Sequence, residues 1–164
     1  MEHNKFMSLA LKEAEKAKKK EEVPIGCVVV HNNKVIAKGH NLRETKNDPT
    51  LHAEIIAIKK ASRKLGAWRL TGVTVYATVE PCLMCIGALV LARVNKLVFG
   101  AYDKKAGACG SIYDISKDGR LNHRIEVISG VMEKECRNIM RAFFRELRNE
   151  RKARKAGHGK TITN

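Results

Sequence analysis

Apolar residues recur at helical spacing near the start of the chain. Phe6, Ala10 and Ala14 would share one face of a helix, and polar residues fill most of the positions between them. We therefore predict an amphipathic helix over about residues 3–20. Two strand-like runs follow in "VPIGCVVVHNNKVIAKGHN", and the polar turn at residues 31–34 between them predicts a β-hairpin.

The next part of the chain alternates between helical and strand patterns. "RETKNDPT" is polar and predicts a loop. "LHAEIIAIKKASRKLG" predicts a helix with Ile55, Ile56, Leu65 and its alanines facing inward. Gly66 is placed to end that helix as a C-cap. "GVTVYATV" predicts a strand, "PCLMCIGALVLA" a helix with Pro81 in its first position, and "KLVFGAY" another strand.

A glycine-rich segment over residues 104–122 predicts a long loop, and "RIEVISGV" after it predicts the last strand. "EKECRNIMRAFFRELRNERKARK" predicts a long basic helix that frays into the final residues. The alternation of helices and strands favours a three-layer α/β fold. With 164 residues, 44% of them hydrophobic, we expect a single domain over 1–164, with a basic helix and tail from about 131.

The chain is strongly basic. It has 32 Lys and Arg against 17 Asp and Glu, which gives a net charge of +15. Eight basic and two acidic residues follow from Arg141 onward, so both the body and the tail carry the excess. The charge predicts a polyanionic partner, most often a nucleic acid, although a merely solvated basic surface is the alternative.

The sequence shows no feature typical of a membrane or secreted protein. No apolar run approaches the roughly 20 residues of a membrane span, and the N-terminus lacks the apolar block of a signal peptide. Five cysteines are an odd number for a disulfide framework, so we expect a cytoplasmic protein. Cys27 is expected to be a buried strand thiol, and Cys109 and Cys136 inert structural thiols.

Cys82 and Cys85 form a Cys-x-x-Cys pair at a predicted helix start, a geometry that fits a redox pair, two core thiols or half of a metal site. A thioredoxin-like redox site needs a proline later in the chain, and none follows Pro81. His52, at the start of another predicted helix, would supply a third ligand. Two thiolates and one imidazole suit Zn²⁺ and leave a position for water, as in catalytic zinc sites.

Glu54 lies two residues after His52. Its carboxylate could therefore stand beside a water molecule without ligating the metal, and act as a general acid and base. An isolated glutamate at a helix start is usually only solvated. Here, however, it belongs to a complete His-x-Glu…Pro-Cys-x-x-Cys pattern, which is typical of zinc-dependent nucleobase deaminases.

Between about Val23 and Phe144 the chain resembles the bacterial-type tRNA-specific adenosine deaminases. The matching stretches include "VPIGCVVV", "DPTLHAEIIAI", "EPCLMCIGAL", "FGAYDKKAGACGS" and "AFFRELR". The resemblance implies a cytidine-deaminase-like fold with a mixed five-stranded sheet, one zinc ion per subunit, a homodimer, and conversion of adenosine to inosine at the wobble position of a tRNA anticodon loop. The alternatives are a deaminase of a free base or nucleoside, such as guanine or cytosine, and a non-catalytic zinc-stabilised RNA-binding module.

The resemblance also implies roles for residues outside the metal site. Asn41 would hold the target purine, Ile25 would pack on its face, and the backbone around Ala53 would help to orient it. Asp103 and Lys105 match a loop that approaches the neighbouring nucleotides. The basic residues of the last helix are expected to attract RNA phosphates; they are Arg141, Arg145, Arg148, Arg151 and Lys152.

Overall fold

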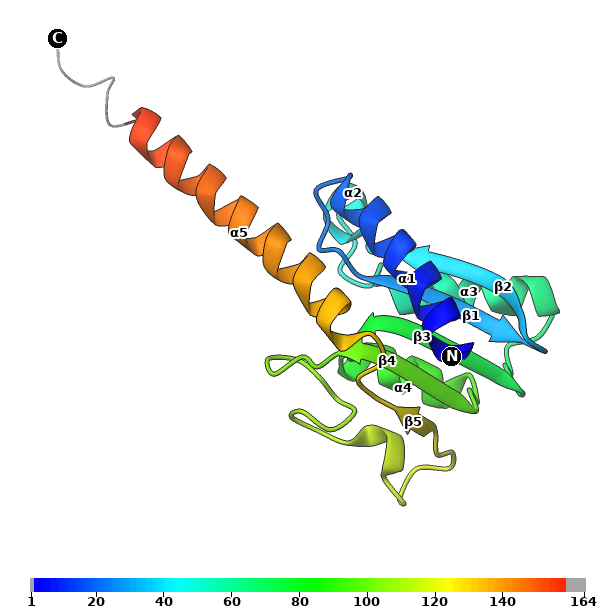
Figure 1. Ribbon diagram of the computed structural model, residues 1–164. Helices are drawn as coiled ribbons and strands as arrows, with labels where there is room; N and C mark the ends of the chain where they lie inside the picture. Colours follow the sequence, from blue (N-terminus) through cyan, green and yellow to red (C-terminus); the bar gives the residue numbers. More distant parts are fainter. Residues whose placement is uncertain (1, 159–164) are drawn as a thin grey trace, which may run out of the picture.

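The structure is a computed structural model that describes residues 2–158. A mixed five-stranded sheet forms its centre, with strand order β2-β1-β3-β4-β5 (Figure 1). The strands are β1 (Gly26–His31), β2 (Lys34–His40), β3 (Val73–Val79), β4 (Lys96–Ala101) and β5 (Glu126–Ile128). The helices are α1 (Glu2–Lys18), α2 (Arg43–Lys46), α3 (Ala53–Leu65), α4 (Leu83–Leu91) and α5 (Glu133–His158), with a short 3₁₀ helix, η1, at Ile115–Lys117.

The strand directions differ across the sheet. β1 is antiparallel to both β2 and β3, whereas β3, β4 and β5 are parallel. The predicted hairpin of β1 and β2 is confirmed. Its turn residues Asn32 and Asn33 have φ values of 48° and 59°, and a two-residue turn with positive φ at both positions matches the twist of the two strands.

Two helical layers cover the sheet, so the predicted three-layer α/β arrangement is confirmed (Figure 1). α1 and the start of α5 pack on one face, where Phe6 meets strand residues such as Val28 and Tyr76. α3 and α4 pack on the other face, where Ala57 and Leu89 join one continuous core with inward-facing strand residues. Alternate side chains of each central strand therefore enter different cores, as the strand period of two requires.

α3 lies unusually close to β2 because Gly39 has no side chain. A Cβ atom at Gly39 would collide with the backbone carbonyl oxygen of Ala53, in the first turn of α3. Small residues on both elements thus allow the backbone of α3 to approach the sheet directly. This close approach fixes the N-terminus of α3 beside the end of β2.

The topology brings four separate segments to one edge of the sheet. β3 and β4 are parallel, so Cys82 and Asp103, which follow them, lie at the same edge. β2 runs in the same direction as β3 because β1 is antiparallel to both, so Asn41, after β2, joins them. Ile25, which precedes β1, completes the set. Ligands of open α/β sheets bind at this kind of edge, beyond the carboxyl ends of the strands.

The structure corrects several local predictions. "RETKNDPT" is not all loop, because its first four residues form α2, where the buried carboxylate of Glu22 accepts hydrogen bonds from the N–H groups of Glu44 and Thr45. Pro81 is not in the first position of α4, since Cys82 is the N-cap residue and the carbonyl oxygen of Pro81 accepts a bond from Ala108 instead.

Two further predictions about helices were also wrong. Leu65, expected to be buried, has 36% of its surface exposed, because the alanines Ala57 and Ala61 form the contact face of α3. The last helix continues to His158 rather than fraying after Lys155, and residues 159–164 lie outside the described part of the chain. Among residues 2–158, no helix has both the length and the apolar character that crossing a bilayer requires.

Candidate active site

Two helix N-termini converge on a cluster of three potential metal ligands. His52 is the N-cap residue of α3, Cys82 is the N-cap residue of α4, and Cys85 lies in the first turn of α4. The Nδ1 atom of His52 lies 3.7 Å from the Sγ atom of Cys82 and 3.6 Å from that of Cys85. The three ligand atoms all lie within 4.8 Å of one another, so the cluster is able to hold a metal ion.

The cluster favours a thiolate at Cys82. The hydrogen bond from Cys85 lowers the pKa of Cys82 to about 4, and the bond to His52 acts in the same direction. The bond with Cys82 in turn raises the pKa of His52 and, together with burial, raises the pKa of Cys85. The positive ends of two helix dipoles also stabilise negative charge at this point.

Glu54 reaches the same region from α3, and only 4% of its surface is exposed. Burial raises the pKa of its carboxyl group. Its Oε2 atom is buried without a hydrogen-bond partner among the described residues. A buried oxygen of this kind normally has a donor. Glu54 is therefore not the solvated glutamate of an ordinary helix start.

Asn41, Ile25 and Ala53 are brought together beside the cluster. The Oδ1 atom of Asn41 accepts a hydrogen bond of 2.9 Å from the N–H group of Ala53, and the N–H group of Asn41 donates to the carbonyl oxygen of Ile25. Asn41 is buried, with 6% of its surface exposed. It is thus not an ordinary turn asparagine, because it joins the end of β2 to the N-terminus of α3.

Asp103 and Lys105 lie on the loop that follows β4. The carboxylate of Asp103 accepts hydrogen bonds from the N–H groups of Lys105 and Ala106, and the side chain of Lys105 is exposed. The loop returns to the cluster, because Gly107 forms a β-bridge with Cys82. Asp103 and Lys105 therefore lie in a loop that directly contacts residues 81–82, which we call the metal-ligand segment because Cys82 is a potential metal ligand.

Sequence reasoning missed Glu80. Its side chain has 3% of its surface exposed and accepts four hydrogen bonds from the loop after β4. The available signal was its position, since an acidic residue stands between the buried strand β3 and the Pro-Cys of the metal-ligand segment. A charged side chain that is buried at the end of an apolar strand needs an oppositely charged partner or several hydrogen-bond donors.

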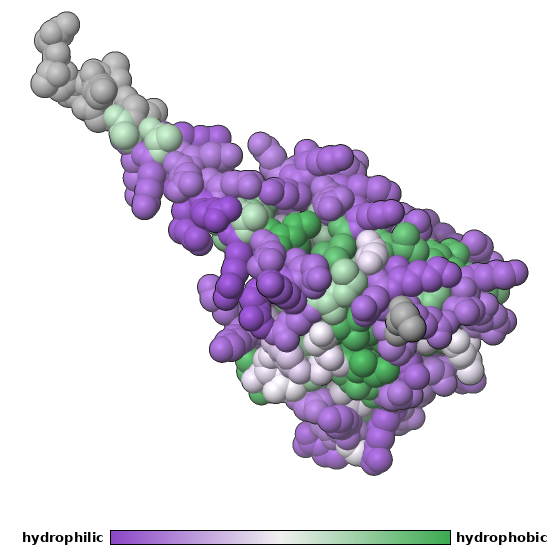
Figure 2. Space-filling model, in the orientation of Figure 1, coloured by the Kyte–Doolittle hydropathy of each residue, from purple (hydrophilic) through white to green (hydrophobic). Residues whose placement is uncertain are grey.

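The basic residues predicted to contact RNA lie exposed on α5, which projects from the body of the protein (Figure 1). Figure 2 shows that the surface of the projecting helix is mainly hydrophilic. Arg141, Arg145, Arg148 and Lys152 follow one another at intervals of three or four residues and so share a helix face. Arg151 instead lines a cavity of about 790 Å³ between α5, α2 and the segment after α1.

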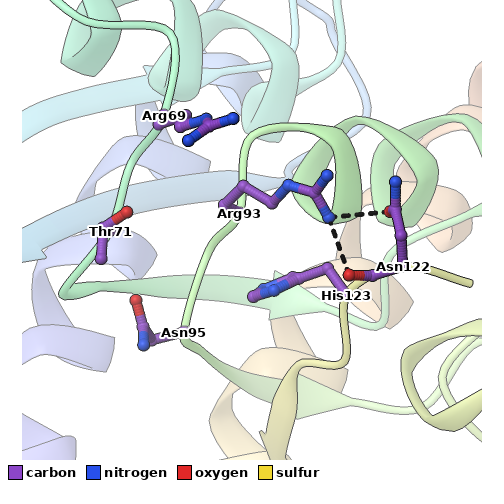
Figure 3. Close-up of a pocket in the computed structure, with 6 residues that line it drawn as sticks. All are labelled: Arg69, Thr71, Arg93, Asn95, Asn122 and His123. Carbon is purple, nitrogen blue, oxygen red and sulfur yellow. Dashed lines mark hydrogen bonds between the residues drawn. The ribbon is translucent and has the colours of Figure 1, made fainter.

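A second pocket, of about 400 Å³, lies at the opposite edge of the sheet (Figure 3). Segments that precede β3, β4 and β5 line it, with Arg69, Thr71, Arg93, Asn95, Asn122 and His123. Arg93 donates to the backbone and side-chain oxygens of Asn122. The lining contains basic and neutral polar side chains and no acidic one, which favours an anionic ligand.

The remaining cysteines are free and buried. Cys27 is fully buried in β1, as predicted. Burial raises the pKa of Cys136 to about 12 and also raises the pKa of Cys109. Both thiols are therefore protonated near neutral pH, which agrees with the prediction that they are inert.

Comparison with known proteins places this site in a family. The model of the MafB19-like deaminase family matches residues 1–148. The tRNA-specific adenosine deaminase of Bacillus subtilis (strain 168) is 53% identical over 148 residues, which cover 90% of this chain and 92% of that protein. The enzyme of the same name from Streptococcus pyogenes serotype M18 (strain MGAS8232) is 47% identical, with 92% and 95% of the two chains covered.

Solved structures agree with this relationship. A structure from studies of A-to-I editing by tRNA:A34 deaminases at the wobble position of transfer RNA superposes with a TM-score of 0.79 at 43% identity, covering 82% of this chain and 97% of that chain. Guanine deaminase from Bacillus subtilis gives a TM-score of 0.59 at 38% identity, with 62% and 66% covered. The chain belongs to the deaminase family, in the group of the bacterial tRNA-specific adenosine deaminases.

Proposed function

We propose that this protein is a zinc-dependent hydrolase that deaminates adenosine to inosine at the wobble position of a tRNA anticodon loop. The observation that carries the proposal is the convergence of His52, Cys82 and Cys85 beside Glu54, whose buried Oε2 atom has no hydrogen-bond partner within residues 2–158. The names of the similar enzymes support tRNA as the substrate. The proposed unit is one deaminase domain over residues 1–164.

The donor set fits zinc. Two thiolates and a neutral imidazole are typical ligands of Zn²⁺, and three protein ligands leave one position free. Both cysteines must bind as thiolates, and the thiols release their protons when the metal binds. Bound zinc would supply the Lewis acidity that makes water nucleophilic near neutral pH.

In this proposal Glu54 is the catalytic acid and base. Its unpartnered oxygen would accept a proton from the attacking water molecule. The same carboxyl group would deliver this proton to N1 of the adenine ring. It would then take the second proton from the new hydroxyl group on C6 and deliver it to the amino group, which leaves as ammonia as the C6–N bond breaks. Burial raises the pKa of Glu54, so its carboxylate accepts a proton more readily than an exposed carboxylate does.

The residues beside the cluster would hold the base. Asn41 uses its side-chain oxygen to accept the bond from Ala53, which leaves the side-chain NH₂ group available to a purine. Ile25, partly buried against the core, would pack on the face of the base. A wobble adenosine is accessible to such a site because an anticodon loop is single-stranded and its bases can be splayed out.

RNA phosphates would contact three basic surfaces. Lys105 lies on the loop next to the cluster. The exposed basic side chains of α5 form a second surface, with Arg141, Arg145, Arg148 and Lys152 on one face of the helix and Arg151 beside the cavity next to α2. Arg69 and Arg93 in the pocket of Figure 3 would add a third surface. Binding through such contacts weakens steeply as the salt concentration rises.

We also propose a homodimer that pairs through α4. Leu83, Gly87 and Leu91 lie four residues apart and therefore share one face of this helix. Leu83 and Leu91 have 50% and 72% of their surfaces exposed, and Gly87 has no neighbour within 4 Å of an added Cβ atom. Such an apolar stripe with a central glycine suits close packing against a second copy of the helix.

The substrate and the cysteines agree with a cytoplasmic enzyme. A tRNA substrate is found in the cytoplasm, and five free cysteines suit a reducing compartment. The free-base alternative has weaker support, because the relatives at 47–53% identity are tRNA-specific adenosine deaminases. The tRNA:A34 deaminase also superposes with a TM-score of 0.79, against 0.59 for guanine deaminase from Bacillus subtilis. The deciding assay offers an anticodon stem-loop with a wobble adenosine, free guanine and free cytosine to the zinc-loaded protein. We expect inosine from the stem-loop and no conversion of either base.

A further inference from the structure

The side-chain carboxylate of Glu80 accepts four hydrogen bonds, all from one loop. Its Oε1 atom accepts from the N–H groups of Cys109 and Ser111, at 2.9 and 3.0 Å. Its Oε2 atom accepts from the N–H group of Asp103 at 3.0 Å and from the hydroxyl group of Ser111. The donors lie 23 to 31 residues after Glu80, in the segment over residues 103–111, which we call the 103–111 loop.

The same loop is joined to the metal-ligand segment. The N–H group of Ala108 donates to the carbonyl oxygen of Pro81 at 2.9 Å, and Gly107 forms a β-bridge with Cys82. Gly107 lies so close to Glu80 that an added Cβ atom would collide with its carboxylate. The glycine is thus required for the approach of the loop to Glu80.

The hydrogen bonds continue from Glu80 to the exposed end of the loop. Glu80 holds the N–H group of Asp103, and the carboxylate of Asp103 accepts from the N–H groups of Lys105 and Ala106, at 2.9 and 3.2 Å. The side chains of Lys104 and Lys105 are exposed. The carboxylates of Glu80 and Asp103 therefore determine the position of the Lys104 and Lys105 side chains relative to Cys82.

We propose that Glu80 is a positioning residue that fixes the 103–111 loop against the metal-ligand segment, so that Lys105 meets a phosphate of the RNA next to the target nucleotide. This inference rests on the proposed function. It identifies Glu80 as a residue that controls RNA affinity at the proposed active site. Glu80 acts through the loop and does not touch the reacting atoms. A charged carboxylate with four donors is a strong anchor, because charge-assisted hydrogen bonds exceed neutral ones in strength.

The test is a double-mutant cycle between Glu80→Gln and Lys105→Ala. Stem-loop binding is measured with zinc-loaded protein at several salt concentrations, in a Glu54→Gln background so that the RNA is not converted. With Glu80 present, Lys105→Ala should reduce the slope of log K against log salt by about 0.7, the value for one contact with single-stranded RNA. In the Glu80→Gln variant, Lys105→Ala should have almost no effect on this slope, because Lys105 no longer reaches its phosphate.

Glu22→Gln is the matched control. Glu22 is also buried and accepts two backbone hydrogen bonds, but its donors Glu44 and Thr45 belong to α2. In that variant Lys105→Ala should keep its full effect on the salt slope. Equal effects of Lys105→Ala with and without Glu80 would overturn the proposal.

Amide hydrogen exchange gives a second readout that does not depend on RNA. The N–H groups of Asp103, Cys109 and Ser111 should exchange slowly in the wild type and at least tenfold faster in Glu80→Gln. If Glu80→Gln fails to fold, Ser111→Ala, which removes one of the four bonds, should accelerate exchange at Asp103 and Cys109 to a smaller extent. Unchanged exchange at these amides would contradict the proposal.

The proposed function and the role of Glu80 can fail separately. If the wild type does not deaminate the stem-loop, the proposed function is contradicted. The exchange experiment still tests the role of Glu80, because it uses no RNA.

Discussion

The side-chain oxygen of Asn41 accepts a hydrogen bond of 2.9 Å from the backbone N–H group of Ala53. The bond links the end of β2 to the first turn of α3, which carries Glu54 and is preceded by His52. His52 itself makes no side-chain bond to the helix start, so Asn41 acts as the cap from a distant part of the sequence. The side chain of Asn41 therefore positions the start of α3 and also lies where the target base is proposed to bind.

Asn41 substitutions should separate these two roles. Asn41→Ala leaves the N–H group of Ala53 without an acceptor, and we expect it to lower the free energy of unfolding by about 1–2 kcal/mol. Asn41→Asp keeps the acceptor, and a carboxylate is favourable at a helix N-terminus, so stability should stay close to that of the wild type. Both variants lack the side-chain NH₂ group and should raise KM for the stem-loop. Chemical denaturation and steady-state kinetics measure the two effects, and normal KM in Asn41→Asp would contradict the role in binding.

Leu91→Glu should convert the proposed dimer to a monomer. Leu91 has 72% of its surface exposed on the apolar face of α4, and a carboxylate there would be desolvated at the interface. Leu65→Glu on α3, with 36% of the leucine exposed, is the control and should leave the dimer intact. Sedimentation velocity distinguishes the outcomes. A wild type that is monomeric at micromolar concentration would refute the interface.

Truncation after Leu147 should weaken RNA binding and flatten its salt dependence. The truncation removes Arg148, Arg151 and Lys152 and keeps Arg141 and Arg145. Each phosphate contact that is lost should reduce the salt slope by about 0.7–0.9. A protein truncated after His158 is the control, because it keeps all five of these residues. An unchanged slope after the shorter truncation would mean that the basic face of α5 is only solvated.

Glu13 should contribute to stability in a pH-dependent way. Burial raises the pKa of Glu13, but hydrogen bonds from Lys16 and His40 outweigh burial, so the net pKa lies below the ordinary value of 4.5. A lowered pKa means that the stabilisation is complete above pH 4.5 and is lost as the pH falls through the folded-state pKa.

Glu13→Gln should therefore lower the free energy of unfolding by about 1–3 kcal/mol at pH 7. The difference from the wild type should shrink as the pH falls below 4.5. Denaturation at a series of pH values measures this difference. Glu15→Gln, at an exposed position of the same helix, is the control and should leave the pH profile unchanged. A difference that stays constant down to pH 3 would rule out the charge of Glu13 as its cause.

The sequence predicted the elements of the fold because their patterns are local. The hairpin turn of Asn32 and Asn33, the C-cap at Gly66 and the strand periodicity all depend on neighbouring residues. α2 was missed because it depends on the carboxylate of Glu22, about 20 residues away. Leu65 was predicted to be buried from periodicity alone, which does not show where the covering elements end.

The cluster of three potential metal ligands could be predicted because the three residues have characteristic spacing and chemistry. His52, Cys82 and Cys85 meet in the structure as expected. The cap formed by Asn41 and the anchor formed by Glu80 could not be derived from the residues, since each joins segments through hydrogen bonds across the sheet edge. Such contacts depend on the strand directions, and the antiparallel placement of β1 brings Ile25 and Asn41 to this edge.

The role of Glu54 in RNA deamination is tested by comparing the wild type with Glu54→Gln on one anticodon stem-loop that bears a wobble adenosine. Both proteins are loaded with zinc, and inosine is measured after digestion of the RNA to nucleosides. We expect the wild type to form inosine. Glu54→Gln should bind zinc and RNA as the wild type does, while its turnover falls by about 10²-fold or more, because the carboxylate that moves the protons is missing. Full activity of Glu54→Gln would exclude Glu54 as the catalytic acid and base, and no inosine from the zinc-loaded wild type would exclude wobble-adenosine deamination.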